Sequence, residues 1–117
     1  MQVKEKYGEF GKAELFNISK GNGCQLMKNV PDGEIMQVTA AVIMVDETVD
    51  RGTGETREKE ILHLKTTNGV YTTESPTVRN TFLAAVQFME TYELTFRLMR
   101  GQSKQGRPYM DLELVEA

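Results

Sequence analysis

The residues best suited to bind another molecule are gathered in one stretch, Thr95 to Tyr109. It holds no acidic residue, and its four cations are Arg97, Arg100, Lys104 and Arg107. The pattern predicts two strands joined by a glycine-bounded loop, with an aromatic residue near each end. A basic hairpin flanked by aromatic residues is suited to contact a polyanion. The alternative is a solvated hairpin whose charges only add solubility.

Residue types that carry out catalysis are scarce. The chain has one histidine and one cysteine, His63 and Cys24, too few for a Cys/His metal cluster. We expect His63 on a sheet face, as a structural residue or a stacking contact. The acids between Asp46 and Asp50 would serve a hydrolase or transferase only if they gathered around a metal ion. We therefore expect no catalytic site, no metal site and no cofactor.

Length and composition indicate one domain of 117 residues, enough to bury a core. No apolar run is long enough to span a bilayer, and the polar N-terminus lacks the apolar core of a signal peptide. A single cysteine fits a reducing compartment. These features predict a cytoplasmic protein without a membrane partner.

Charge is unevenly distributed along the chain. Residues 1–56 hold six Lys/Arg and nine Asp/Glu, residues 57–109 hold eight and five, and residues 110–117 hold none and three. The middle is therefore basic although the chain carries −3 overall. Such asymmetry points to nucleic acid, while the net charge argues against coating duplex DNA by charge alone.

The pattern of apolar residues predicts five strands and one helix. Glu34–Val49 carries apolar residues at both odd and even positions, as expected for a bent strand buried on more than one side. A polar loop leads to a second strand in which Leu62 and Leu64 share the core face. Asn68-Gly69 predicts a tight turn into a short third strand, Val70–Thr73, in which we place Val70 and Thr72 inward.

The helix begins after Ser75-Pro76, a typical N-cap and first helical residue. The basic hairpin supplies the fourth and fifth strands. This order is that of the OB-fold, a mainly β, five-stranded Greek-key barrel with one helix between strands three and four. We expect residues 34–117 to form this domain, with residues 1–33 packed on the barrel or partly disordered.

In an OB-fold the ligand lies across strands two and three, between the loop joining strands one and two and the loop joining four and five. The mixture of aromatic and cationic side chains predicted there suits single-stranded nucleic acid better than duplex. The expected binding residues are Arg57, Lys59, His63, Lys65, Tyr71, Arg97, Arg100, Lys104, Arg107 and Tyr109.

Two segments carry a family resemblance. The run TNGVYTTESPTVR (Thr67–Arg79) and the run SKQGRPY (Ser103–Tyr109) resemble small single-stranded DNA-binding proteins of phages and prophages of Gram-positive bacteria. The resemblance spans about residues 34–117. It implies an OB-fold that coats exposed strands during replication or recombination, often as a dimer, with binding roles for Tyr71, Lys104, Arg107 and Tyr109. The chain departs from the family in lacking tryptophan and a long acidic tail.

We therefore expect a non-enzymatic, sequence-tolerant single-stranded DNA-binding protein. It would act as a homodimer, with replication or recombination proteins as further partners. The alternative is a phage-encoded OB-like module that binds a protein and no nucleic acid. The two hypotheses differ in the surroundings of Tyr109, because acids such as Glu60, Asp111 and Glu113 crowded beside it would favour a protein partner.

Overall fold

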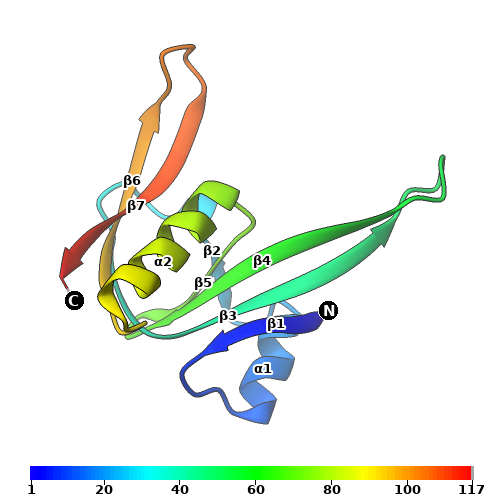
Figure 1. Ribbon diagram of the computed structural model, residues 1–117, viewed down its shortest axis with the longest axis horizontal. Helices are drawn as coiled ribbons and strands as arrows, with labels where there is room; N and C mark the ends of the chain where they lie inside the picture. The colour runs from blue at the N-terminus through cyan, green and yellow to red at the C-terminus, as the bar shows by residue number, and fades with distance from the viewer. Residues whose placement is uncertain (117) are drawn as a thin grey trace.

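The computed structural model describes residues 1–116, so the last residue of the expected 34–117 domain lies outside the described part. The chain is mainly β, with one curled sheet that forms a half-barrel (Figure 1). Its elements are β1 (Gln2–Tyr7), α1 (Lys12–Ser19), β2 (Cys24–Leu26), the 3₁₀ turn η1 (Met27–Asn29), β3 (Ile35–Val49), β4 (Thr56–Thr66), β5 (Gly69–Thr73), α2 (Pro76–Met89), β6 (Thr95–Gln102) and β7 (Pro108–Glu116). The curled sheet is compatible with an OB-like fold.

The sheet runs in the order β2-β5-β4-β3-β6-β7, and β1 also pairs with β3. The order of elements expected from the sequence is confirmed: β3, β4 and β5 precede α2, and β6 and β7 follow it. Among the described pairings, β5 is joined to β4 and β2, and β7 to β6 alone. The half-barrel is therefore open along a seam. Strands β5 and β2 lie on one side of this seam, and β7 lies on the other.

The long strand β3 is buried on both faces between residues 40 and 44, as its sequence indicated. Ala41 and Ile43 point into the main core, whereas Val42 and Met44 point into a second cluster. The pairing with β4 shifts register between Val38 and Ala40, an irregularity typical of a bent strand. This bend lets one strand serve two parts of the sheet, pairing with β6 near its start and with β1 further along.

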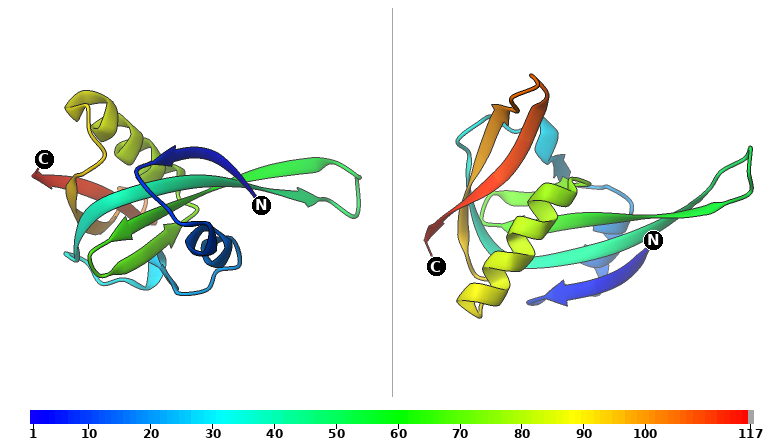
Figure 2. Two further views of the ribbon diagram at one scale, coloured as in Figure 1. Left: turned by 90° about the horizontal axis from the view of Figure 1, so that it is seen from below. Right: turned by 45° about the horizontal axis from the view of Figure 1, so that its top comes forward.

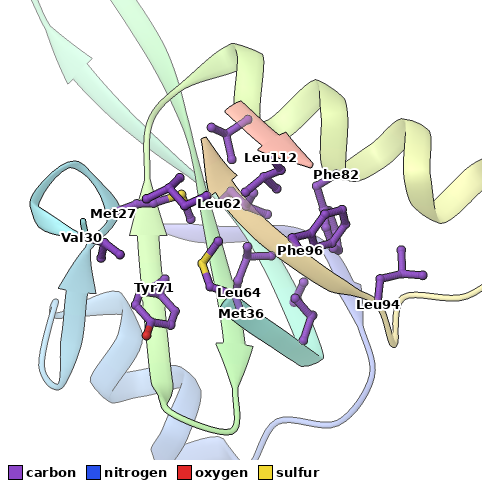
Figure 3. Packing of buried hydrophobic residues seen from close by; sticks show 14 of the residues in the cluster. Met27, Val30, Met36, Leu62, Leu64, Tyr71, Phe82, Leu94, Phe96 and Leu112 are labelled. Carbon is purple, nitrogen blue, oxygen red and sulfur yellow. The ribbon is translucent and has the colours of Figure 1, made fainter. Parts of the chain in front are cut away.

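The main core lies between the concave face of the sheet and α2 (Figure 3). The predicted start of the helix is confirmed, since Ser75 precedes it and its Oγ accepts a hydrogen bond from the Val78 amide at 3.2 Å. Val78 and Phe82 are fully buried, and Phe82 packs against Phe96 of β6.

Part of residues 1–33 packs on the opposite, convex face, whereas Met27 and Val30 belong to the main core and Tyr7 packs against it. Phe10 and Ile18 cover Ala40, Val42 and Met44 of β3 on the convex face, forming the second apolar cluster. We call the part from Phe10 to Cys24 the cover segment. It contains α1, which lies below the sheet in Figure 1.

Two hairpins project from this body in different directions (Figure 2). The β6–β7 hairpin carries the basic stretch. The outer half of the β3–β4 hairpin, residues 46–60, carries six acids and three cations, and we call it the acidic ribbon. Glu47 and Glu58 are directly opposite each other in it.

Candidate nucleic-acid interface

The tip of the β6–β7 hairpin is a compact loop. The Ser103 amide donates to the Arg107 carbonyl at 2.8 Å, the Gly106 amide donates to the Ser103 carbonyl at 2.8 Å, and Gly106 has a φ of +79°. This geometry suits glycine because a side chain disfavours positive φ. The loop holds Lys104 and Arg107 at the end of a projecting hairpin. Both side chains are exposed, and neither forms an ion pair among the described residues.

Tyr109 lies across the partner strand. It pairs with Gly101, and a Cβ built on Gly101 would come within 2.6 Å of the Tyr109 hydroxyl oxygen. The absence of a side chain at position 101 therefore lets the ring rest on the backbone. The tyrosine is still 51% exposed. One side of the ring is supported and the rest is accessible, an arrangement that suits stacking on an unpaired base.

The other two hairpin cations are engaged. Arg97 pairs with Glu113 across the strands at 2.8 Å. Arg100 was among the residues expected to bind the ligand, but its contacts do not fit this role. It lies within β6, half-buried, and its guanidinium donates to the carbonyl oxygens of Met27 at 2.8 Å, Lys28 at 2.6 Å and Val30 at 2.9 Å. Arg100 joins the hairpin to η1, because a guanidinium can reach several acceptors at once.

Three acids were expected as possible neighbours of Tyr109, and each contacts another side chain. Glu113 is held by Arg97. Asp111 accepts a hydrogen bond from the Thr81 hydroxyl at 2.6 Å. Glu60 is paired with Lys4 and with Arg79. Glu60 and Glu113 are matched by cations, whereas Asp111 accepts hydrogen bonds from a hydroxyl and from the Leu112 amide and forms no ion pair among the described residues.

His63 and Lys65 do not line an open face, contrary to expectation. His63 is 2% exposed, and its Nδ1 lies 2.9 Å from the Thr72 hydroxyl. Burial lowers the pKa of His63 to about 4. Lys65 is half-buried beneath the cover segment, 2.8 Å from Glu14 and 5.4 Å from the centre of the Phe10 ring. The hydrogen bond from Lys65 lowers the pKa of Glu14.

Tyr71 was expected on the outer face of the third strand, and this is wrong. Leu64 pairs with Tyr71 across the β4–β5 hairpin, and paired residues project to the same side of a sheet. Since Leu64 faces the core, Tyr71 does so too. It is 3% exposed and lies among the apolar side chains of Figure 3. Val70 and Thr72, expected inward, take the convex side.

Two further expected residues of β4 lie apart from the β6–β7 hairpin. Arg57 is on the acidic ribbon, 4.0 Å from Asp50. Lys59 is paired with Glu74 at 2.7 Å. Lys59 also lines a groove of about 420 Å³ at the seam of the half-barrel, together with Leu26, Lys28, Ile61, Thr72 and Met110.

The expected residues are thus brought together only in part. The hairpin unites Lys104, Arg107 and Tyr109, with Arg97 and Arg100 in other roles. Sequence reasoning missed Gly101, although an isolated glycine within a strand pattern signals close approach of another group. It also missed Lys28 and Leu26, which carry no local signal because only the fold brings them beside the seam.

Two further features concern metal ions and membranes. No group of three or more His, Cys, Asp or Glu side chains is placed to hold a metal ion within residues 1–116. In the same part of the chain, no helix is long and apolar enough to cross a membrane.

The chain was also compared with known proteins. No protein-family model matches it, and no solved structure matches it. Over 108 residues it is 29% identical to the single-stranded DNA-binding protein of Bacillus phage PZA, a match that covers 89% of this chain and 85% of the phage protein.

Proposed function

We propose that this protein binds single-stranded DNA without sequence preference and coats exposed strands during phage or prophage DNA replication or recombination. The observation that carries the proposal is the β6–β7 hairpin. There the ring of Tyr109 lies over Gly101, on the same hairpin as two cations without carboxylate partners among the described residues. Aromatic stacking combined with backbone cations is the usual basis of sequence-tolerant strand binding.

The similarity to a phage protein named for single-stranded DNA binding supports this function and extends over most of the chain. The pairing of Glu60 and Glu113 with cations favours a polyanion over a protein ligand. We further propose that β3 to β7 with α2 are an OB barrel left open between β5 and β7. The strand order β5-β4-β3-β6-β7 supports this assignment.

A fluorescence titration with labelled oligothymidylate over a series of salt concentrations tests the function. Each phosphate neutralised on a single strand contributes roughly −0.7 to the log–log salt slope. With Lys104, Arg107 and one further cation engaged, we expect a slope of about −2. Equal affinity for duplex of the same length, or no binding at low salt, would contradict the proposal.

A second candidate, binding of a protein partner, is favoured by one observation. Phe88 on α2 is 85% exposed, and exposed aromatic residues are enriched at protein interfaces. The same titration separates the two, because a purely protein-binding module would leave the oligonucleotide signal unchanged. The expected homodimer and the replication or recombination partners remain predictions, and sedimentation of the purified chain would test the dimer.

A further inference from the structure

The convex face of β4 and β5 is closed to a ligand over much of its length. The cover segment packs on it, His63 is buried, and Lys65 is paired with Glu14. A strand of DNA following the usual path across an OB-fold would meet α1 there. The ligand must therefore take another path, or use only the part of this face that the cover segment leaves open.

The groove at the seam begins where the cover ends. Thr72 pairs with both His63 and Leu26, so these three side chains share the convex face. Leu26 is 46% exposed, whereas His63 is buried. From Thr72 and Ile61 the groove extends across the seam to Met110 of β7, whose side chain projects to the opposite face of the strand from that of its neighbour Tyr109. Its volume of about 420 Å³ lies in the range of sites for small organic groups.

The chemistry of the groove fits a nucleotide. Leu26, Ile61 and Met110 offer apolar surface to a base. Lys28 lies at the same groove, forms no ion pair among the described residues and can meet a phosphate. The carboxylate of Glu74 is held by Lys59 at 2.7 Å, which reduces its repulsion of an anion.

Arg100 connects this groove to the hairpin. Its guanidinium binds the carbonyls of Met27, Lys28 and Val30, and its own amide donates to Asp32 at 2.8 Å. These bonds hold η1, and with it the backbone of Lys28, against β6. The groove and the stacking ring of Tyr109 are therefore parts of one fixed structure.

From these contacts we propose that the seam groove between β2, β5 and β7 is a nucleotide-binding subsite, which seats one base on Leu26, Ile61 and Met110 with its phosphate near Lys28. The strand would run from the hairpin into the seam and not over the cover segment. The inference rests on the proposed single-stranded DNA binding and specifies the path of the strand.

Two matched substitutions test it. Leu26→Glu places a carboxylate in the groove, and Phe88→Glu places one at an exposed apolar position on α2, outside the groove. Both variants change the net charge equally, and circular dichroism and the Tm verify folding. Because a lost base contact costs roughly 1–3 kcal/mol, we expect Leu26→Glu to weaken oligothymidylate binding about tenfold or more. Phe88→Glu should change it less than about twofold, since distant charges are screened.

A second measurement does not depend on Leu26→Glu folding. Lys28→Ala should reduce the steepness of the salt slope by about 0.7, whereas Lys12→Ala, an exposed lysine on α1, should leave the slope unchanged. Oligothymidylate containing 4-thiothymidine should also photocrosslink to peptides that include Leu26–Asn29 or Met110.

The outcomes are distinguishable. If the unmodified protein binds no oligothymidylate at low salt, the proposed function fails and the inference fails with it. If the protein binds but each variant matches its control and crosslinks avoid both segments, the function stands and the seam path is wrong.

Discussion

At the scale of single residues, Gly101 explains how a tyrosine can be both fixed and accessible. The ring of Tyr109 occupies the space that a side chain at position 101 would fill. The backbone at Gly101 has no positive φ, so alanine can adopt its conformation. The only effect of the substitution there is the steric one of the added methyl group. A substitution at the glycine therefore moves the ring without altering charge or backbone conformation.

We predict that Tyr109→Ala weakens single-stranded DNA binding by roughly 1–3 kcal/mol, because a stacking contact is lost. Tyr109→Phe should retain most of the affinity. Gly101→Ala should weaken binding by displacing the ring, while Gly11→Ala, where no atom lies within 4 Å of the added Cβ, should not. Fluorescence anisotropy measures each effect. Full affinity in Gly101→Ala would show that the position of the ring is unimportant.

His63 determines a pH dependence of stability. Its pKa in the folded protein is about 4 because burial disfavours the charged ring. In the unfolded chain the pKa is about 6.5. The unfolded state therefore binds the proton first, and the stability contributed by neutral His63 is lost as the pH falls from about 6.5 towards 4.

Between pH 7 and pH 5 we expect the free energy of unfolding to fall by about 2 kcal/mol, from the difference in the two pKa values. Urea denaturation at each pH measures it. His63→Leu should remove this dependence in the same interval. A dependence that persists in the variant would assign it to another group.

At the scale of elements, the four cations of the basic hairpin divide into different roles. Arg100 binds three carbonyls of the η1 region, Arg97 binds Glu113, and Lys104 and Arg107 are exposed at the tip. Composition alone cannot separate them, because each role depends on which acceptors the fold places nearby.

We expect Arg100→Ala to lower the free energy of unfolding by about 2 kcal/mol, since it leaves partly buried carbonyls without donors. Arg100→Lys should not restore it, because one ammonium group cannot replace the guanidinium fork. Lys104→Ala should change stability by less than about 0.5 kcal/mol. Chemical denaturation provides the comparison, and equal stability of the two alanine variants would contradict the structural role of Arg100.

The affinity for DNA, unlike the stability, should depend on the exposed cations at the tip of the hairpin. Lys104→Ala and Arg107→Ala should each reduce the steepness of the salt slope by about 0.7. Arg97→Ala should have a smaller effect, because its charge is already matched by Glu113 at 2.8 Å. Titrations at several salt concentrations test this. A full effect from Arg97 would place the outer face of β6 in the interface.

At the scale of the whole molecule, charge separates the two projecting hairpins. The acidic ribbon holds six acids against three cations, and Glu47 faces Glu58. The ribbon should repel phosphate, although the sequence suggested Arg57 as a binding residue. We expect Arg57→Ala to change affinity less than about twofold and to leave the salt slope unchanged. A slope change of about 0.7 would bring the ribbon into the binding site.

The inward orientation of Tyr71 could have been predicted from the sequence. The tight turn at Asn68-Gly69 and the inward Leu64 together require that Tyr71 face the core, since residues paired across a short hairpin share a side. The burial of His63 and Lys65 was different. That of Lys65 depends on Phe10 and Glu14, which are more than 45 residues away in sequence.

The sequence by itself determined the succession of strands, the helix after Ser75 and the basic hairpin. These depend on local periodicity, capping and turn chemistry, which neighbouring residues specify. Only the tertiary structure decided which cations remain exposed and which face is open. Burial and pairing are made by contacts between distant segments: the cover segment closes the convex face, the guanidinium of Arg100 binds the carbonyls of η1, and the seam leaves a groove lined by Met110 of β7.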